Sequence, residues 1–96
     1  MKTTIVIQIG NSDNKLSQID WSCFIHKTHS LIDKYADQVH FEGFSVPTAV
    51  WQNACWVFTI NAEDSHKLWD AMKLLRAEFQ QDSIAWTEGI TVFIDE

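Results

Sequence analysis

The chain has 96 residues, with 7 Lys and Arg against 13 Asp and Glu, so its formal net charge is −6. This length predicts a single domain over residues 1–96. Hydrophobic residues make up 46% and charged residues 21%, which is typical of a globular domain and excludes a disordered one. The acidic balance argues against direct nucleic-acid binding, because phosphate-backbone binders cluster Lys and Arg. An acidic surface is compatible with a basic protein partner or with plain solubility.

The sequence contains no stretch approaching the ~20 apolar residues of a membrane span. The apolar run over residues 5–9 is too short for a signal peptide and contains Gln8. We therefore expect the mature protein to begin near Met1 and to stay in the cytoplasm. Two cysteines, Cys23 and Cys55, are too few for a disulfide framework and are expected as free buried thiols.

The start of the chain predicts a strand followed by a long helix. Residues 4–9 alternate with a period of two and are rich in β-branched side chains, which favours a strand. Residues 10–14 are typical of a turn. Ser17 is a candidate N-cap with Asp20 three residues later, and apolar residues then recur at helical spacing. The pattern predicts a helix over about residues 17–36.

The remaining elements indicate the fold. We predict strands over 38–45, 54–60, 83–87 and 90–94, and a second helix that begins after Asn61. Glu88 and Gly89 form a two-residue turn signal, so the end of the chain is expected to be a hairpin or one bent strand. The order predicts an α+β fold, a ferredoxin-like βαββαβ sandwich. It has an antiparallel sheet, two helices on one face and a short extra C-terminal strand.

This architecture leaves one face of the sheet open. The predicted core side holds Ile5, Ile7, Ile9, Val39 and Phe41. The predicted open side holds Val6, Gln8, His40, Glu42, Phe44, Cys55, Val57 and Thr59. An open face with several apolar groups usually pairs with something. We expect self-association into a homodimer through this face, with a partner protein or a small ligand as the alternatives.

Five tryptophans in one small domain are candidates for core or for recognition. Trp21 and Trp69 fall on helix stripes and are expected in the core, while Trp56 is expected in the core or at the sheet interface. Trp51 lies in a loop and Trp86 beside a turn, where a rigid aromatic next to polar groups suits recognition. Their polar neighbours, also candidate binding residues, are Gln52, Asn53, Ser83, Thr87 and Glu88.

Catalytic and metal-binding patterns are weak. Cys23, His26 and His29 recur at every third position of the first helix, and His40 and Glu42 share one strand face. A zinc site needs a more complete ligand set. The loop after the first strand has one glycine and lacks the phosphate-binding motif. We therefore expect no cofactor, no metal and no enzymatic activity.

Three strings carry a resemblance. They are residues 1–13 (MKTTIVIQIGNSD), residues 51–58 (WQNACWVF) and residues 81–89 (QDSIAWTEG). The whole chain resembles a group of small uncharacterised bacteriophage and prophage proteins, and these strings carry the resemblance. The resemblance implies context only and transfers no catalytic residues. Small acidic phage proteins are often inhibitors of host defence systems that act by binding.

Three functional hypotheses result. The first is an inhibitor whose acidic surface docks onto a basic host protein, such as a nucleic-acid-binding defence component. It predicts salt-sensitive binding that is lost on charge reversal at Asp13, Glu42 or Glu88. The second is an oligomeric binder of a small molecule, such as a nucleotide signal. It would stack a base on Trp51 or Trp86. The third is a small enzyme of unknown chemistry.

The strings also make a geometric prediction. If the first and third strands pair in parallel, the segment after residue 10 and the segment before residue 54 lie at opposite ends of the sheet. A single pocket built from both is then disfavoured within one subunit, although a dimer interface could join them. On this reasoning Trp51-Gln52-Asn53 and residues 83–88 are separate candidate sites.

Overall fold

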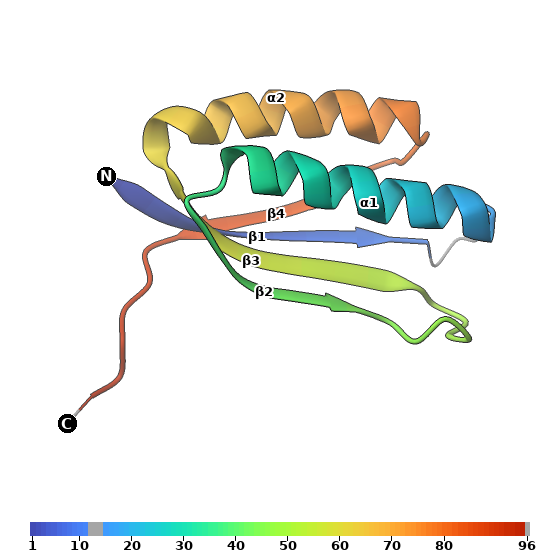
Figure 1. The fold of residues 1–96 in the computed structure, drawn as a ribbon, viewed down its shortest axis with the longest axis horizontal. Helices are drawn as coiled ribbons and strands as arrows, with labels where there is room; N and C mark the ends of the chain where they lie inside the picture. Colours follow the sequence, from blue (N-terminus) through green and yellow to red (C-terminus); the bar gives the residue numbers. More distant parts are fainter. Residues whose placement is uncertain (12–14, 96) are drawn as a thin grey trace.

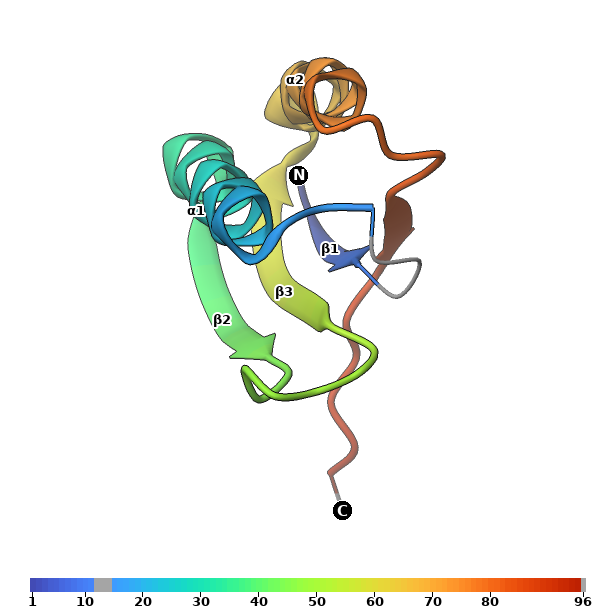
Figure 2. The same ribbon diagram turned by 90° about the vertical axis from the view of Figure 1, so that its right-hand side faces the viewer.

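The computed structural model describes residues 1–11 and 15–95. Its elements in chain order are β1 (Lys2–Gly10), α1 (Gln18–Tyr35), β2 (Gln38–Phe44), β3 (Asn53–Asn61), α2 (Ala62–Glu78) and β4 (Ala85–Gly89). The strands form one antiparallel sheet in the order β2-β3-β1-β4. Both helices cover the same face of the sheet (Figures 1 and 2). The predicted ferredoxin-like topology is confirmed.

Helix α1 is anchored as its sequence predicts. The Ser17 hydroxyl accepts a hydrogen bond from the Asp20 backbone N–H at 3.1 Å, which satisfies one of the free donors of the first turn. Phe24 is fully buried and stacks on Phe79, with ring centroids 4.8 Å apart. This contact lies between α1 and the end of α2, so it fixes the two helices against each other over the sheet.

The first and third strands pair antiparallel, as the predicted antiparallel sheet requires, so the condition of parallel pairing that separated the two candidate sites is not met. The crossover helix α1 makes β1 and β2 parallel in direction, and β3 reverses direction after β2. Strands β1 and β3 are therefore antiparallel, with Gly10 opposite Asn53. The end of β1 and the start of β3 are neighbours in one subunit, and the Asn11 N–H donates to the Gln52 carbonyl at 2.8 Å.

A bulge in β2 corrects the predicted faces of that strand. The β2–β3 register shifts between Val39 and Phe41, so one extra residue is inserted at His40. Beyond the bulge, alternation resumes with the opposite phase: Glu42 pairs with buried Trp56, and Phe41 turns to the open face. The Phe41 ring lies over Gly43, where an added Cβ would be 2.6 Å from the ring. Phe44, like Glu42, lies on the helix side of the sheet, with its ring edge-on to Trp56.

The end of the chain forms neither of the two predicted alternatives, a hairpin or one bent strand, and residues 90–94 do not form the predicted extra strand. Glu88 and Gly89, expected as a turn, are paired within β4, opposite Ile5 and Thr4. Strand β4 begins at Ala85, and residues 90–95 continue as an extended segment outside the sheet (Figure 1). The turn signal failed because antiparallel pairing with β1 satisfies the backbone of both residues.

Several side chains expected in the core are exposed. Trp21 is buried as predicted, whereas Trp69 is 47% exposed on the flank of α2. Cys23 is exposed on α1 and Cys55 is half-buried on the open face of the sheet, so neither is a buried thiol.

Within the described residues no helix is long and apolar enough to cross a membrane.

Candidate binding groove beside α2

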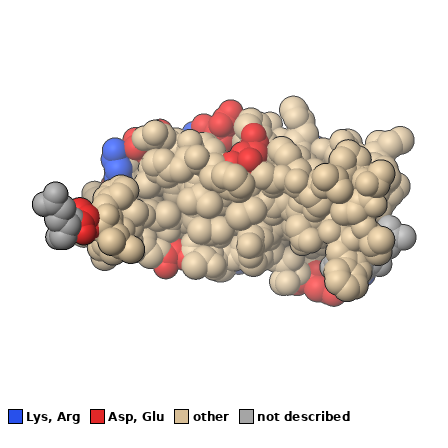
Figure 3. All heavy atoms as spheres, turned by 90° about the horizontal axis from the view of Figure 1, so that it is seen from below, with Lys and Arg blue, Asp and Glu red and all other residues tan. Residues whose placement is uncertain are grey.

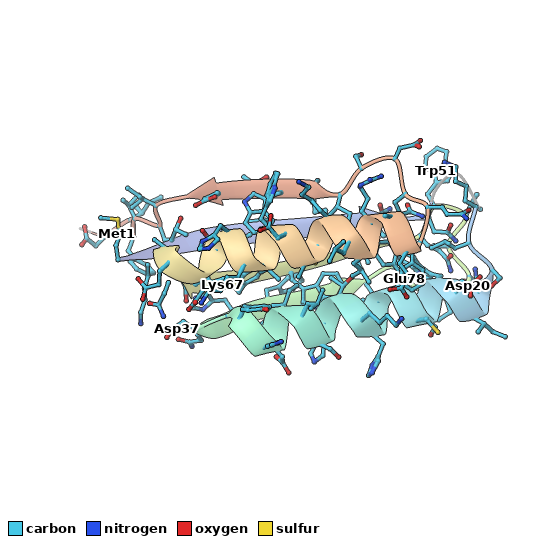
Figure 4. All side chains as sticks on the ribbon, turned by 90° about the horizontal axis from the view of Figure 1, so that it is seen from above. Met1, Asp20, Asp37, Trp51, Lys67 and Glu78 are labelled. Carbon is cyan, nitrogen blue, oxygen red and sulfur yellow. The ribbon has the colours of Figure 1, made fainter. Side chains whose placement is uncertain are left out.

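The end of α2 directs the chain into a groove. After Glu78 the helix ends in a Schellman motif, with Gln80 in the left-handed region at φ 53° and the Gln81 N–H bonded to the Arg76 carbonyl at 3.0 Å. The Arg76 guanidinium in turn donates to the Gln81 carbonyl at 2.7 Å. These bonds fold the chain back, so that the segment leading into β4 runs beside α2 (Figure 4).

A groove of about 200 Å³ lies between α2 and this returning segment. Its lining residues are Trp69, Met72, Lys73, Arg76, Asp82, Ser83, Ile84 and Trp86. The rings of Trp69 and Trp86 meet edge to face, with centroids 5.1 Å apart. The groove therefore combines two indole rings with a cationic rim from the helix.

The charges around the groove are arranged unevenly. Within the part of the chain that the structure describes, the Lys73 ammonium makes no hydrogen bond or ion pair. Arg76 uses one nitrogen to hold Gln81, and Asp82 accepts from Lys15 at 3.4 Å. The lining thus holds two cations from α2 and one carboxylate, Asp82, which is paired with Lys15, and this balance favours an anionic group on an occupant that lies against α2.

Of the predicted C-terminal site residues, the structure brings two into the groove. Ser83 and Trp86 line it, and the Trp86 indole N–H donates to the Glu88 carboxylate at 3.2 Å. Glu88 is therefore a neighbour of the groove. Thr87 pairs with Val6 and faces the opposite, open side of the sheet, so it does not contribute to the same surface.

The Trp51-Gln52-Asn53 segment lies apart from the groove and plays a structural role. Gln52 is 5% exposed, and its amide exchanges two hydrogen bonds with Gln18 at 2.9 and 2.7 Å and accepts a third from Asn11 at 3.1 Å. The Asn53 amide donates to the Trp51 carbonyl at 3.2 Å. Trp51 itself is exposed at the end of the molecule where α1 begins (Figure 4). The polar groups that were expected to read a ligand are occupied in holding this loop.

Of the three residues of the predicted acidic surface, the structure describes two, and these two lie apart. Asp13 lies outside the described residues, and Glu42 and Glu88 occupy β2 and β4, the two edges of the sheet. Three strand spacings of ~4.8 Å separate those edges by roughly 14 Å. The Glu42 carboxylate is also engaged internally, because it accepts from the Trp56 indole at 2.8 Å and contacts His29 Nδ1 at 2.5 Å.

Charge reversal at Glu42 is therefore expected to act on stability. Glu42→Lys removes the acceptor of the buried Trp56 indole, and an unsatisfied buried donor costs about 1–3 kcal/mol. Urea unfolding followed by tryptophan fluorescence should show this loss. Glu88→Lys, on an exposed edge, is the matched control and should change the free energy of unfolding by less than about 0.5 kcal/mol. Equal losses in the two variants would contradict this role of Glu42.

The histidine and cysteine pattern of α1 gives no metal-ligand cluster among residues 1–11 and 15–95. His29 contacts Glu42, and this contact links α1 to β2. His29 also lies 3.4 Å from Asp33 on its own helix. These side chains serve an inter-element contact.

Sequence reasoning missed the helical half of the groove. Lys73 and Arg76 are three residues apart on α2, and Trp69 precedes them by one turn, so all three lie on one flank of the helix. This spacing is visible in the sequence, but the segment that forms the other wall of the groove is identified only from the fold. Comparison with known proteins found no matching family and no matching curated protein.

Proposed function

We propose that this chain is a non-catalytic binding protein that docks a partner protein in the groove beside α2. The supporting observation is the groove itself, where Trp69, Trp86 and Arg76 come together. Tryptophan and arginine are the side chains that most often dominate protein–protein binding energy. At about 200 Å³ the groove is smaller than the ~300–1,000 Å³ typical of small-molecule sites, and it suits one anchoring side chain.

The chemistry of the groove indicates what the partner presents. Indole walls favour an aromatic or aliphatic anchor, and the Lys73 and Arg76 rim favours a neighbouring carboxylate. This local preference differs from the overall charge of −6, which led to the expectation of a basic partner. The resemblance to phage proteins indicates which class of protein the partner belongs to. We propose a component of the bacterial host's defence, which the chain inhibits by occupying one of its surfaces.

Charge reversal in the rim tests this proposal. Lys73→Glu is expected to abolish capture of the partner from host lysate, because it places a carboxylate against the partner's own. Lys34→Glu is the control, since Lys34 is an exposed cation on α1, beside Tyr35 and outside the groove. Affinity capture with quantitative mass spectrometry should show one protein that is retained by wild type and the control and lost with Lys73→Glu. Equal loss in both variants, or retention in both, would contradict a groove-mediated contact.

A small anionic ligand is the second candidate for the same groove. It is favoured by one observation, that the Trp86 ring lies in a groove with two cationic side chains. A planar acid could stack on the indole and pair with Lys73. Titration of candidate mononucleotides against tryptophan fluorescence tests this alternative. Saturable quenching that is lost in Lys73→Glu would favour it over a protein anchor.

A further inference from the structure

The C-terminal segment is an exposed apolar arm. Ile90, Val92, Phe93 and Ile94 are each at least 80% exposed. Residues 90–94 are four β-branched residues and one aromatic residue, a composition typical of strands. Four large apolar side chains fully in water on one short segment are unusual for a monomer and mark an interaction surface. We call residues 90–95 the C-terminal arm.

The arm leaves the sheet on its open side. The Thr3 hydroxyl donates to the carbonyl of Gly89, the last residue of β4, at 3.1 Å. Within the arm, the Thr91 hydroxyl contacts the Thr4 hydroxyl. Thr4 alternates with buried Ile5 and therefore faces away from the helices. Figures 1 and 2 show the arm extending away from the sheet on the side opposite α1 and α2.

Most of the open face beside the arm is uncharged. Through the strand registers the positions that point to it are uncharged, among them Val6, Phe41, Val57 and Thr87, except Lys2 at the start of β1, which is paired with Asp37. Figure 3, which looks onto this side of the molecule, shows mostly uncharged residues. An apolar arm and a mostly uncharged face on the same side of one chain are complementary in chemistry.

We propose that the C-terminal arm packs against the open sheet face of a second copy of this chain, in a two-fold exchange. A two-fold axis brings the arm of each copy to the face of the other, so that both exposed features are buried at once. Strands of five to nine residues give the face a footprint of roughly 500 Å². A stable interface needs about 800 Å² per partner, so the face requires the further surface that the arm supplies. The groove beside α2 lies on the helix side and stays free in this arrangement.

The solution mass of the full chain tests the exchange. Wild type is expected to have twice the 11.1 kDa chain mass by light scattering after size exclusion, and the double variant Val92→Asp with Phe93→Asp is expected to be monomeric. Both replaced side chains are in solvent within one subunit, so folding should be unchanged by circular dichroism. Val50→Asp, equally exposed in the β2–β3 loop, is the control and should stay dimeric. A monomeric wild type, or a dimeric arm variant, would overturn the proposal.

A photo-crosslinker placed at Phe93 locates the arm. With benzoylphenylalanine at this position and a mixture of isotope-labelled and unlabelled protein, we expect crosslinked peptides of mixed isotope content. They should join the arm to residues 4–8 or 55–59 of the other copy. Crosslinks only within one chain would show that the arm folds onto its own face, and the absence of crosslinks would show an arm in solvent. Either result would overturn the exchange.

Discussion

Replacement of Asn11 by alanine is expected to lower the free energy of unfolding by about 2–4 kcal/mol, because it leaves several buried polar groups without partners. Asn11 is 1% exposed. Its amide donates to the Leu16 carbonyl at 3.0 Å and to Gln52 Oε1 at 3.1 Å, and its oxygen accepts from the Leu16 N–H at 3.0 Å. One side chain thus ties the end of β1 to the start of α1 and to the loop before β3.

Equilibrium urea unfolding of the Asn11 variant measures this loss. Asn53→Ala is the matched control, since Asn53 is an exposed asparagine whose amide makes one local bond, to the Trp51 carbonyl. We expect the control to lose less than about 0.5 kcal/mol. If Asn11→Ala were as stable as Asn53→Ala, the polar cluster around Gln52 would have no structural role, and its amides would be available to a ligand.

Trp69→Ala is expected to weaken partner binding by roughly 30–200-fold, which corresponds to the ~2–3 kcal/mol of a buried tryptophan anchor. In the free protein Trp69 is half exposed and contacts Trp86. Its removal should therefore affect binding more than folding. Partner contact would bury the remaining ring surface and exclude water from the cationic rim, which strengthens the charge pairing there.

Calorimetric titration of the captured partner against the variant measures this effect. Leu74→Ala is the control, because Leu74 is an exposed apolar residue on α2 that does not line the groove. It should bind within about threefold of wild type. If Leu74→Ala weakened binding as much as Trp69→Ala, the contact would follow the outer face of α2 and bypass the groove.

The sequence pattern predicts some elements correctly and fails for others, and both outcomes have physical causes. Periodicity located both helices and the first strands, because each buries one face against the same core. The phase of β2 was missed because a bulge at His40 inserts one residue without any glycine or proline to mark it. The turn assigned to Glu88 and Gly89 was overridden by pairing with β1. Local signals do not contain either long-range constraint.

The candidate site was predicted in part. Ser83 and Trp86 were selected as polar and aromatic residues near a chain turn, and both line the groove. Gln52 was selected on the same reasoning and is a buried structural amide. The difference arises from antiparallel β1–β3 pairing, which places Gln52 beside Asn11. The cationic half of the groove comes from α2 and depends on how the chain turns back after Gln80.

Native mass spectrometry shows whether the groove beside α2 captures a partner protein. The purified protein would be sprayed alone and again after mixing with host lysate, with Trp69→Ala and Leu74→Ala treated in parallel. A binding protein that uses the groove predicts one added protein mass that is present with wild type and Leu74→Ala and absent with Trp69→Ala. A small mass retained by the protein alone, with no protein captured from lysate, would contradict docking of a partner protein in the groove and favour a small-ligand site.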